Sequence, residues 1–250
     1  MLKAYVINLD RSEDRLAHMR AELGRQGIDF ERIAAVDGAA LKQTELDAFC
    51  QARAAGKPQG WLPGEVGCFL SHFQAWRRIA AAEDEWAAVL EDDLRVSPDL
   101  AALLASTDWI PADADVVRLE ANRSMRLSKP RAIRVTSGRR LYRAISGTTG
   151  AGAYILSRGA ARRLITTEPA LQTKVDVFLF KPKMSRTARE LRRYQVVPAV
   201  CVQEGLAEGR EGRMKSIIRK RATFGRGYRR RSHPLLRLWP IRRHAVPFRF

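Results

Sequence analysis

The chain has 250 residues, and 46% of them are hydrophobic, so it can bury a sizeable core and is not disordered throughout. Its formal net charge of +18 would suit a nucleic-acid-binding protein, but the charge is unevenly spread: residues 1–180 carry 25 basic and 23 acidic side chains, whereas residues 181–250 carry 20 and 4. We therefore expect an α/β domain over residues 1–205, nearly neutral over its first 180 residues, and a basic, aromatic-containing C-terminal extension over residues 206–250.

The first 40 residues predict a β-α-β unit, the usual start of a nucleotide-binding α/β domain. Residues 5–9 are apolar and rich in β-branched side chains and predict a buried strand, and residues 30–36 predict a second one. Between them, apolar residues recur at helical spacing, and Gly24 and Gly27 end the helix. Because ligands of open α/β sheets bind beyond the carboxyl ends of the strands, polar residues at those ends are candidate ligand contacts.

Four polar residues lie at or just after the ends of these two strands. Asn8, Arg11 and Arg15 belong to the first strand end, and either arginine could hold a phosphate. Asp37 ends the second strand and could bind a ribose hydroxyl. A surface ion pair is the alternative for the charged residues, and the sequence alone leaves both interpretations open.

A stronger amphipathic helix begins at Pro63 and continues to about residue 79. Its apolar positions share one face, and a second stripe carries Cys68, Ser71 and His72. The imidazole of His72 could bond a phosphate, a ribose or an acceptor hydroxyl, and the alternative is a histidine satisfied within the core. The three cysteines of the chain are far apart and form no C-x-x-C pair, so we expect neither a disulfide framework nor a zinc site.

Three adjacent carboxylates follow the hydrophobic strand that residues 86–90 predict. Glu91, Asp92 and Asp93 would repel one another unless solvent or a cation relieves them, and hard divalent cations prefer oxygen ligands. If the strand continues, Glu91 and Asp93 point the same way, in a D-x-D-like arrangement for a metal–diphosphate complex. The alternative is an acidic turn exposed to water.

Two further acids are candidates for proton transfer. Glu120 ends a short strand predicted over residues 115–120, and Asp176 interrupts the apolar run of residues 175–180. An acid in apolar surroundings has a tunable pKa, which suits a general base, so Asp176 is our candidate and Glu120 its rival. The alternative for Asp176 is the N-cap of a helix that starts at Val177.

Taken together, these segments resemble glycosyltransferase family 25, the family of lipopolysaccharide and collagen galactosyltransferases. The most specific part is G-E-V-G-C-F-L-S-H at residues 64–72, followed by the strand end V-L-E-D-D at residues 89–93. The matching segments occur in the family's order over residues 3–182. The remaining ones are residues 5–11 with Asp14 and Arg15, residues 36–38, residues 152–157 with the helix start at 159–160, and residues 175–176.

The resemblance implies a GT-A-like α/β fold with a mixed central sheet flanked by helices. It also implies a UDP-sugar-dependent transferase that moves galactose or glucose, with inversion, to a lipopolysaccharide or related surface glycan. A divalent metal, Mn²⁺ or Mg²⁺, would bind at Asp93 first and then at Glu91 or Asp92. Contacts to the UDP-sugar would come from Asn8, Arg11, Asp37, Ser71, His72 and Asp92.

Two other functions stay open at this point: nucleic-acid binding through the basic C-terminal region, and an inactive transferase-like scaffold. The sequence contains no P-loop, dinucleotide fingerprint, G-x-S-x-G elbow or uncharged apolar stretch of membrane-spanning length. Each basic residue near an anionic membrane contributes about 1 kcal/mol, and apolar side chains of the extension could insert at the interface. We therefore expect a cytoplasmic enzyme, peripheral on the inner membrane, that takes a glycolipid or oligosaccharide acceptor and binds no nucleic acid.

Overall fold

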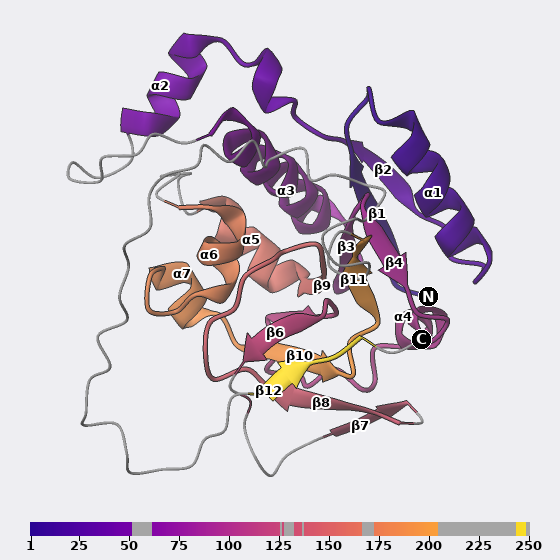
Figure 1. Ribbon diagram of the computed structural model, residues 1–250. Coiled ribbons are helices and arrows are strands. Elements are labelled where there is room, and N and C mark those ends of the chain that lie inside the picture. Colours follow the sequence, from indigo (N-terminus) through magenta and orange to yellow (C-terminus); the bar gives the residue numbers. More distant parts are fainter. Residues whose placement is uncertain are drawn as a thin grey trace.

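The computed structural model describes residues 1–51, 62–125, 127, 133–136, 138–166, 173–204 and 244–248. Its centre is an eight-stranded mixed sheet in the order β2-β1-β3-β9-β5-β10-β8-β7 (Figure 1). Strand β9 runs antiparallel to β3 and β5, whereas β2, β1 and β3 are parallel, as are β5 and β10. Strands β1, β3 and β5 therefore end at the same edge of the sheet. The bounds are β1 (Lys3–Asn8), β2 (Glu31–Ala34), β3 (Trp86–Glu91), β5 (Val116–Arg118), β7 (Ile133–Thr136), β8 (Arg139–Arg143), β9 (Ala153–Ser157) and β10 (Arg193–Val197).

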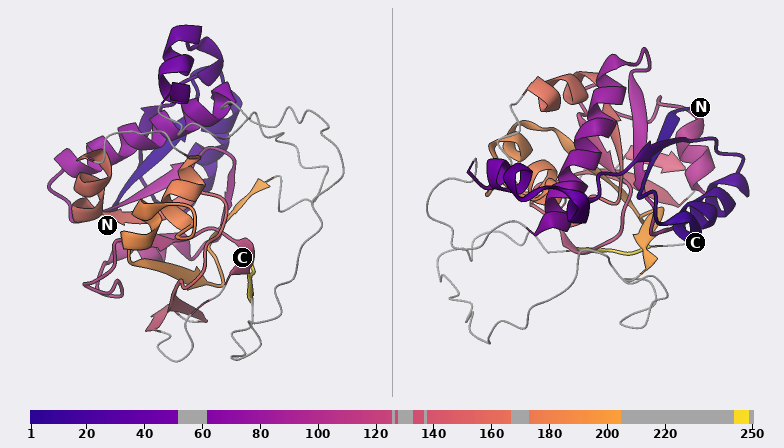
Figure 2. Two further views of the ribbon diagram at one scale, coloured as in Figure 1. Left: turned by 90° about the vertical axis from the view of Figure 1, so that its left-hand side faces the viewer. Right: turned by 90° about the horizontal axis from the view of Figure 1, so that it is seen from above.

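Helices cover both faces of this sheet (Figures 1 and 2). Side chains alternate along a strand, so Tyr5 and Ile7 of β1 pack with α3, α5 and α6, while Ala4 and Val6 pack with α1 and α4 on the other face. The same alternation in β3 and β9 gives the protein two apolar layers, one on each side of the sheet. The helices are α1 (Glu13–Gly24), the 3₁₀ turn η1 (Gly38–Ala40), α2 (Gln43–Gln51), α3 (Pro63–Ala81), α4 (Leu100–Ala105), α5 (Arg158–Thr166), α6 (Val175–Phe180) and α7 (Arg186–Glu190).

Two short antiparallel pairs lie beside the main sheet. Strand β4 (Leu94–Val96) pairs with β11 (Cys201–Gln203), and β6 (Asn122–Met125) pairs with β12 (His244–Val246). The first pair brings the end of β11 to the acidic end of β3, where the backbone N–H of Glu204 donates to the backbone oxygen of Asp93 at 2.8 Å. The second pair attaches a C-terminal strand to the body of the protein, and Val246 is buried there.

The expected β-α-β unit, the helix that begins at Pro63 and the strand that leads into the acidic triplet are confirmed, as is a mixed sheet flanked by helices. The strand does not continue through the triplet: β3 ends at Glu91, and Asp92 and Asp93 form a turn before β4. Residues 175–180 form helix α6, whose N-cap is Lys174, so Asp176 lies in the first turn and the N-cap interpretation is wrong.

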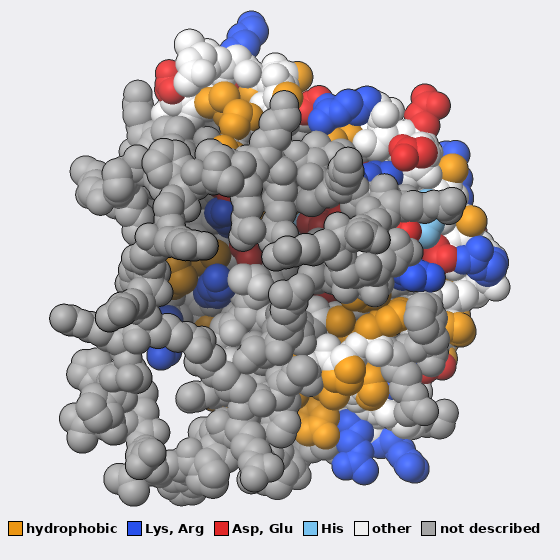
Figure 3. Space-filling view, in the orientation of Figure 1, with side chains coloured by type: hydrophobic (Ala, Val, Ile, Leu, Met, Phe, Trp, Pro, Cys, Tyr) orange, Lys and Arg blue, Asp and Glu red, His pale blue; other side chains and the backbone are white. Residues whose placement is uncertain are grey.

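The surface over α1 carries acidic and basic side chains side by side (Figure 3), as expected of a body with little net charge. Within the part of the chain that the structure describes, no helix is long and apolar enough to cross a membrane. Most of the predicted extension, residues 206–243, lies outside the described residues.

Candidate functional site

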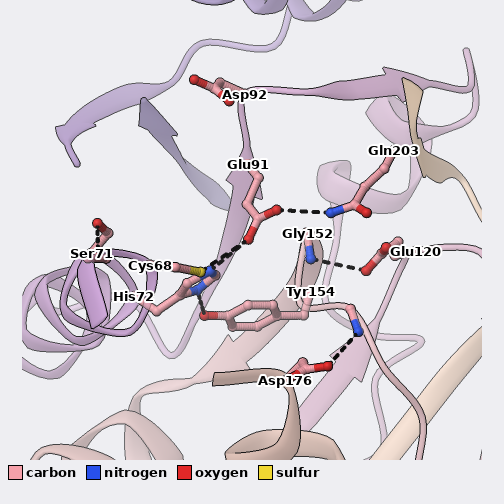
Figure 4. Close-up of polar contacts among 12 residues, drawn as sticks. Cys68, Ser71, His72, Glu91, Asp92, Glu120, Gly152, Tyr154, Asp176 and Gln203 are labelled. Carbon is pink, nitrogen blue, oxygen red and sulfur yellow. Dashed lines mark hydrogen bonds and ion pairs between the residues drawn. The ribbon is translucent and has the colours of Figure 1, made fainter. Parts of the chain in front are cut away.

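The carboxyl ends of three parallel strands bring the predicted polar residues to one edge of the sheet. Asn8 is the last residue of β1, Glu91 is the last of β3, and Glu120 follows β5 by two residues. Figure 4 shows Glu91 and Glu120 with Gln203 of β11 beside them. The rule that ligands bind beyond the carboxyl ends of parallel strands therefore predicted which elements would meet here.

The carboxylate of Glu91 lies between α3 and β11, where it meets a ring donor from His72 and an amide donor from Gln203. Nε2 of His72 lies 3.1 Å from Oε1, Nε2 of Gln203 lies 3.1 Å from Oε2, and Sγ of Cys68 lies 3.9 Å from Oε1. Burial alone would raise the pKa of Glu91, but the hydrogen bonds from His72 and Gln203 outweigh it and hold the pKa below its ordinary value. The carboxylate is therefore ionised at neutral pH.

A chain of aromatic hydrogen bonds holds His72 in place. Nε1 of Trp76 donates to the hydroxyl oxygen of Tyr154 at 2.8 Å, and that oxygen lies 2.8 Å from Nδ1 of His72 (Figure 4). When the Tyr154 hydroxyl donates to Nδ1, the imidazole keeps its proton on Nε2 and donates it to Glu91. All three aromatic side chains are at most 1% exposed, so the chain is dry and the Glu91 carboxylate is fixed in one direction.

Asp92 points the other way, toward α1. Its two oxygens accept from Nδ2 of Asn8 at 2.8 Å and from Nη1 of Arg15 at 3.0 Å. Asn8 in turn donates to the backbone oxygen of Ser12 and accepts from Arg32. Burial raises the pKa of Asp92, although Asn8 and Arg15 oppose that shift. Asn8 and Arg15 thus occupy both oxygens of Asp92, and Arg15 forms a buried ion pair, where the sequence suggested a surface one or a phosphate contact.

Asp93 is the acid of the triplet whose carboxyl group is incompletely hydrogen-bonded within the described residues. Its Oδ1 is buried and has no hydrogen-bond partner among the described residues. Burial, and then the charge of Glu91, raise the pKa of Asp93 to about 8, and Asp92 and Glu120 add to the effect. A divalent cation would satisfy this oxygen and relieve the repulsion, and carboxylate oxygens are the ligands that Mn²⁺ and Mg²⁺ prefer. The buried oxygen of Asp93, near the charge of Glu91, thus fits the metal that the resemblance implies.

Glu120 is 1% exposed and is held by fixed partners. Its Oε2 accepts from Nη2 of Arg118 at 2.9 Å and from the backbone N–H of Gly152 at 3.0 Å. Burial raises the pKa of Glu120, and the charge of Arg118 opposes the shift. The loop before β9 presses on this carboxylate: Gly150 has φ +87°, and a Cβ there would lie 2.7 Å from Oε1 of Glu120, so only glycine fits.

Asp176 lies in the first turn of α6 and is partly exposed. Its Oδ1 accepts from the backbone N–H of Val177 at 2.8 Å, and its Oδ2 accepts from the backbone N–H of Gly150 at 3.2 Å (Figure 4). Both acids proposed as bases therefore contact the same glycine loop, Glu120 from a sealed position and Asp176 from one that solvent reaches.

The other predicted contacts to a UDP-sugar lie farther along the same edge. Arg11 and Asp37 form an ion pair, and Asp37 also caps η1 by accepting from the backbone N–H of Ala39 at 3.0 Å. Ser71 accepts from the backbone N–H of Val36 at 2.9 Å, which ties the end of β2 to α3. This junction is so close that a Cβ on Gly67 would lie 2.5 Å from the backbone oxygen of Val36.

Sequence reasoning missed three residues of this site. Gln203 and Trp76 belong to no motif, and Tyr154 lies in the matching segment 152–157 without an assigned role. Their contacts join residues 78 to 112 positions apart. An indirect signal existed for Trp76, which stands four residues after His72 and so on the same helix face.

Comparison with known proteins identifies the family. Residues 1–179 match the profile of "Glycosyltransferase family 25 (LPS biosynthesis protein)". The lipooligosaccharide biosynthesis protein lic2B of Haemophilus influenzae is 27% identical over 210 residues, which cover 80% of this chain and 76% of that protein. The lacto-N-neotetraose biosynthesis glycosyltransferase LgtE of Neisseria meningitidis serogroup B is 28% identical over 214 residues, covering 81% of this chain and 74% of that protein.

An animal relative matches at higher identity over a smaller part of its length. Procollagen galactosyltransferase 1-B of Xenopus laevis is 33% identical over 187 residues, which cover 71% of this chain and 30% of that longer protein. The relatives are named as glycosyltransferases or as proteins of lipooligosaccharide biosynthesis, and the family profile covers more than half of this chain. The chain therefore belongs to glycosyltransferase family 25 and is an enzyme of the transferase class.

Proposed function

We propose that the protein transfers galactose or glucose from a UDP-sugar to a lipopolysaccharide or related surface glycan, with a divalent metal and with inversion at the sugar. The observation that supports this most is the buried Oδ1 of Asp93, which has no hydrogen-bond partner among the described residues and lies near the charges of Glu91 and Glu120 at the carboxyl edge of the sheet. The names of the bacterial relatives support the acceptor class.

Asp93 and Glu91 would hold the metal, Mn²⁺ or Mg²⁺. When bound, such a metal offsets the charge that develops on the two phosphates of the UDP leaving group. The protein's part is to position the two acids: His72 and Gln203 hold the carboxylate of Glu91, and the backbone N–H of Glu204, directly after β11, holds the backbone oxygen of Asp93. This preorganisation avoids a reorganisation cost during the reaction.

Asp176 is the proposed general base. In a single displacement the acceptor hydroxyl oxygen bonds to the anomeric carbon, the bond from that carbon to the UDP oxygen breaks, and the hydroxyl proton passes to the base. Asp176 is partly exposed, so an acceptor can approach it, whereas Glu120 is sealed and already bound by Arg118 and Gly152. These differences favour Asp176 over Glu120.

The sugar nucleotide would lie along the ends of β1 and β2. Arg11 and Asp37 are partly exposed there and are the candidates for direct contact with phosphate and ribose. His72, Ser71, Asn8 and Asp92 use their polar atoms within the protein, so we propose that they support the UDP-sugar site chiefly by holding their neighbours.

The decisive experiment measures transfer and donor hydrolysis with UDP-galactose, UDP-glucose and UDP-N-acetyl sugars, with and without manganese. We expect one hexose donor to be used only when the metal is present, and a product with a β-linkage by NMR. Asp176→Asn should lose most of the turnover and keep UDP-sugar binding. If Asp176→Asn kept full turnover and Glu120→Gln lost it, Glu120 and not Asp176 would be the general base.

We also propose that residues 206–250 form an extension that binds the anionic face of a membrane, where a glycolipid acceptor lies. The support is compositional: basic clusters at 219–221 and 229–231 with apolar residues between them. Because β12 pairs with β6, truncation would also remove a strand of the body, so replacing the two clusters by glutamine is the cleaner change. We expect lost binding to vesicles of anionic phospholipid and unchanged donor hydrolysis. Retained vesicle binding, or tight salt-sensitive binding of single-stranded nucleic acid, would contradict the proposal.

A further inference from the structure

One corner of the site gathers three different ligand atoms around a single point. Nε2 of His72 lies 3.1 Å from Oε1 of Glu91, Sγ of Cys68 lies 3.9 Å from the same oxygen, and all three atoms lie within 4.8 Å of one another (Figure 4). Cys68 and His72 are four residues apart on α3 and so share a face, and the end of β3 brings Glu91 opposite them. The spacing of the cysteines predicted no zinc site. This group of atoms contains a single cysteine and depends on the packing of α3 against β3, which cysteine spacing does not report.

The chemistry of these atoms differs from that of the proposed Mn²⁺ or Mg²⁺ site. A thiolate and an imidazole suit Zn²⁺ and similar ions, whereas manganese and magnesium prefer carboxylate and water oxygens. We propose that Cys68, His72 and Glu91 form a separate binding site for a thiolate-preferring divalent cation, with Zn²⁺ as the natural occupant.

The spacing of the atoms suits a tetrahedral ion. Metal–ligand bonds of about 2.0–2.3 Å put the ligand atoms of a tetrahedral zinc site roughly 3.3–3.8 Å apart. The separations of 3.1 Å and 3.9 Å at Glu91 bracket that range, so small side-chain movements are enough to close the site. Three protein ligands leave a fourth position open for water or for a substrate atom.

The ligands are also held from behind, as in established zinc sites. Metal-binding histidines usually donate their second ring N–H to a neighbour, and here the Tyr154 hydroxyl oxygen lies 2.8 Å from Nδ1 of His72. With a metal on Nε2, the proton moves to Nδ1 and that N–H donates to Tyr154. Gln203 donates to Oε2 of Glu91 at 3.1 Å and leaves Oε1 for the metal.

Glu91 would then belong to two sites. It faces Cys68 and His72 through Oε1, and it is also a proposed ligand of the metal at Asp93. A zinc ion bound at Cys68 would withdraw Glu91 from that second metal and should oppose manganese-supported transfer. This antagonism rests on the proposed function, whereas the binding of zinc does not.

Cobalt(II) is the probe for binding, because it replaces zinc and gives visible and near-ultraviolet bands that report its ligands. We expect the full-length, metal-free protein to bind one Co²⁺ with a sulfur-to-metal charge-transfer band and the intense visible bands of a tetrahedral ion, and Zn²⁺ to displace it. Cys68→Ser and Cys68→Ala should each remove the charge-transfer band while circular dichroism shows the native fold. Cys201→Ala, a buried cysteine in the apolar layer on the other face, is the matched control and should keep it.

His18→Gln serves as the histidine control, because His18 lies on α1, which packs on the face of the sheet opposite α3, and its Nε2 lies 2.8 Å from the backbone oxygen of Leu94. His72→Gln should lose the tetrahedral cobalt spectrum, and His18→Gln should keep it. Tyr154→Phe removes only the hydroxyl behind His72 and should weaken zinc binding about 10- to 100-fold. A cobalt band that survives both Cys68 variants, or the absence of any charge-transfer band in the native protein, would overturn the proposal.

The kinetic readout separates this site from the proposed function. Zinc should inhibit manganese-supported transfer in the native protein, and Cys68→Ser should reduce that inhibition relative to the variant's own zinc-free rate. A native cobalt–thiolate band in a protein that transfers no hexose would leave the zinc site standing and reject the proposed function. Metal-dependent transfer without the cobalt–thiolate band would support the proposed function and reject the zinc site.

Discussion

The two sides of the turn that follows β3 differ in how fully their polar groups are paired. On the α1 side, both oxygens of Asp92 accept hydrogen bonds, one from Asn8 and one from Arg15. On the other side, Glu91 is held by His72 and Gln203, and one buried oxygen of Asp93 has no partner among the described residues. Neighbouring acids of one motif thus have different roles: Asp92 bonds the turn to β1 and α1, and Asp93 is available to bind a cation.

The largest effect is expected at Asp93. Asp93→Ala removes the proposed ligand whose buried oxygen has no partner among the described residues, so metal-supported transfer should fall by about a thousandfold, which corresponds to roughly 4 kcal/mol of transition-state stabilisation. Initial rates with a UDP-hexose at several manganese concentrations measure it. A normal rate in Asp93→Ala would remove this residue from the metal site and would end the contrast between the two sides of the turn.

The second effect is on stability and is expected at Asp92. Asp92→Ala leaves the buried guanidinium of Arg15 without its carboxylate, and breaking a buried pair in this way costs about 3 kcal/mol or more of the free energy of unfolding. Urea unfolding measures the loss. The control is Glu190→Ala, which breaks a fully exposed pair with Arg186 and should leave the stability nearly unchanged. Equal losses in the two variants would show that the Asp92 side is not structural.

The third effect has the opposite sign. The pKa of Asp93 is about 8 in the folded protein and about 4 in the unfolded chain, so between these values the folded state binds more protons. Its contribution to stability is therefore lost as the pH rises from about 4 to about 8. Asp93→Asn removes this penalty, and the metal-free variant should exceed the native protein by at least about 1 kcal/mol at pH 8 and by little at pH 4. Thermal unfolding in the presence of EDTA at the two pH values tests the sign.

The smallest effect is expected at Arg11, which lies beyond both sides of the turn. Its ion pair with Asp37 is partly exposed, so Arg11→Gln should cost less than about 1 kcal/mol of stability. As a proposed phosphate contact, the same change should raise the KM for the UDP-sugar severalfold. A stability loss as large as that of Asp92→Ala would show that Arg11 belongs to the framework and not to the ligand site.

Patterns along the chain predicted the frame of the site with little error. The β-branched runs, the helical spacing after Pro63 and the acids at the end of β3 each depend on near neighbours in sequence, so local propensity and periodicity were enough. The parallel order of β1, β3 and β5 then brings Asn8, Glu91 and Glu120 to one edge without further information.

The sequence did not predict which side chains bond each acid of the site. Nothing near the acidic triplet indicates that its middle member faces Arg15 and its first member faces His72, because the direction of each side chain depends on where the strand stops and how the turn bends. Gln203 reaches Glu91 across 112 positions only because β11 pairs with β4. Such long-range contacts carry no local signal.

The sequence by itself determined that this is a mixed α/β protein with a transferase-like acidic strand end and a strongly basic C-terminal region, since composition, periodicity and ordered motifs carry that information. Only the tertiary structure decided which acid of the triplet is paired, that an oxygen of Asp93 has no partner among the described residues, and that Cys68 meets His72 and Glu91. The physical reason is that pairing and burial are set by the packing of α1 and α3 on opposite faces of one strand, and packing is a property of the whole fold.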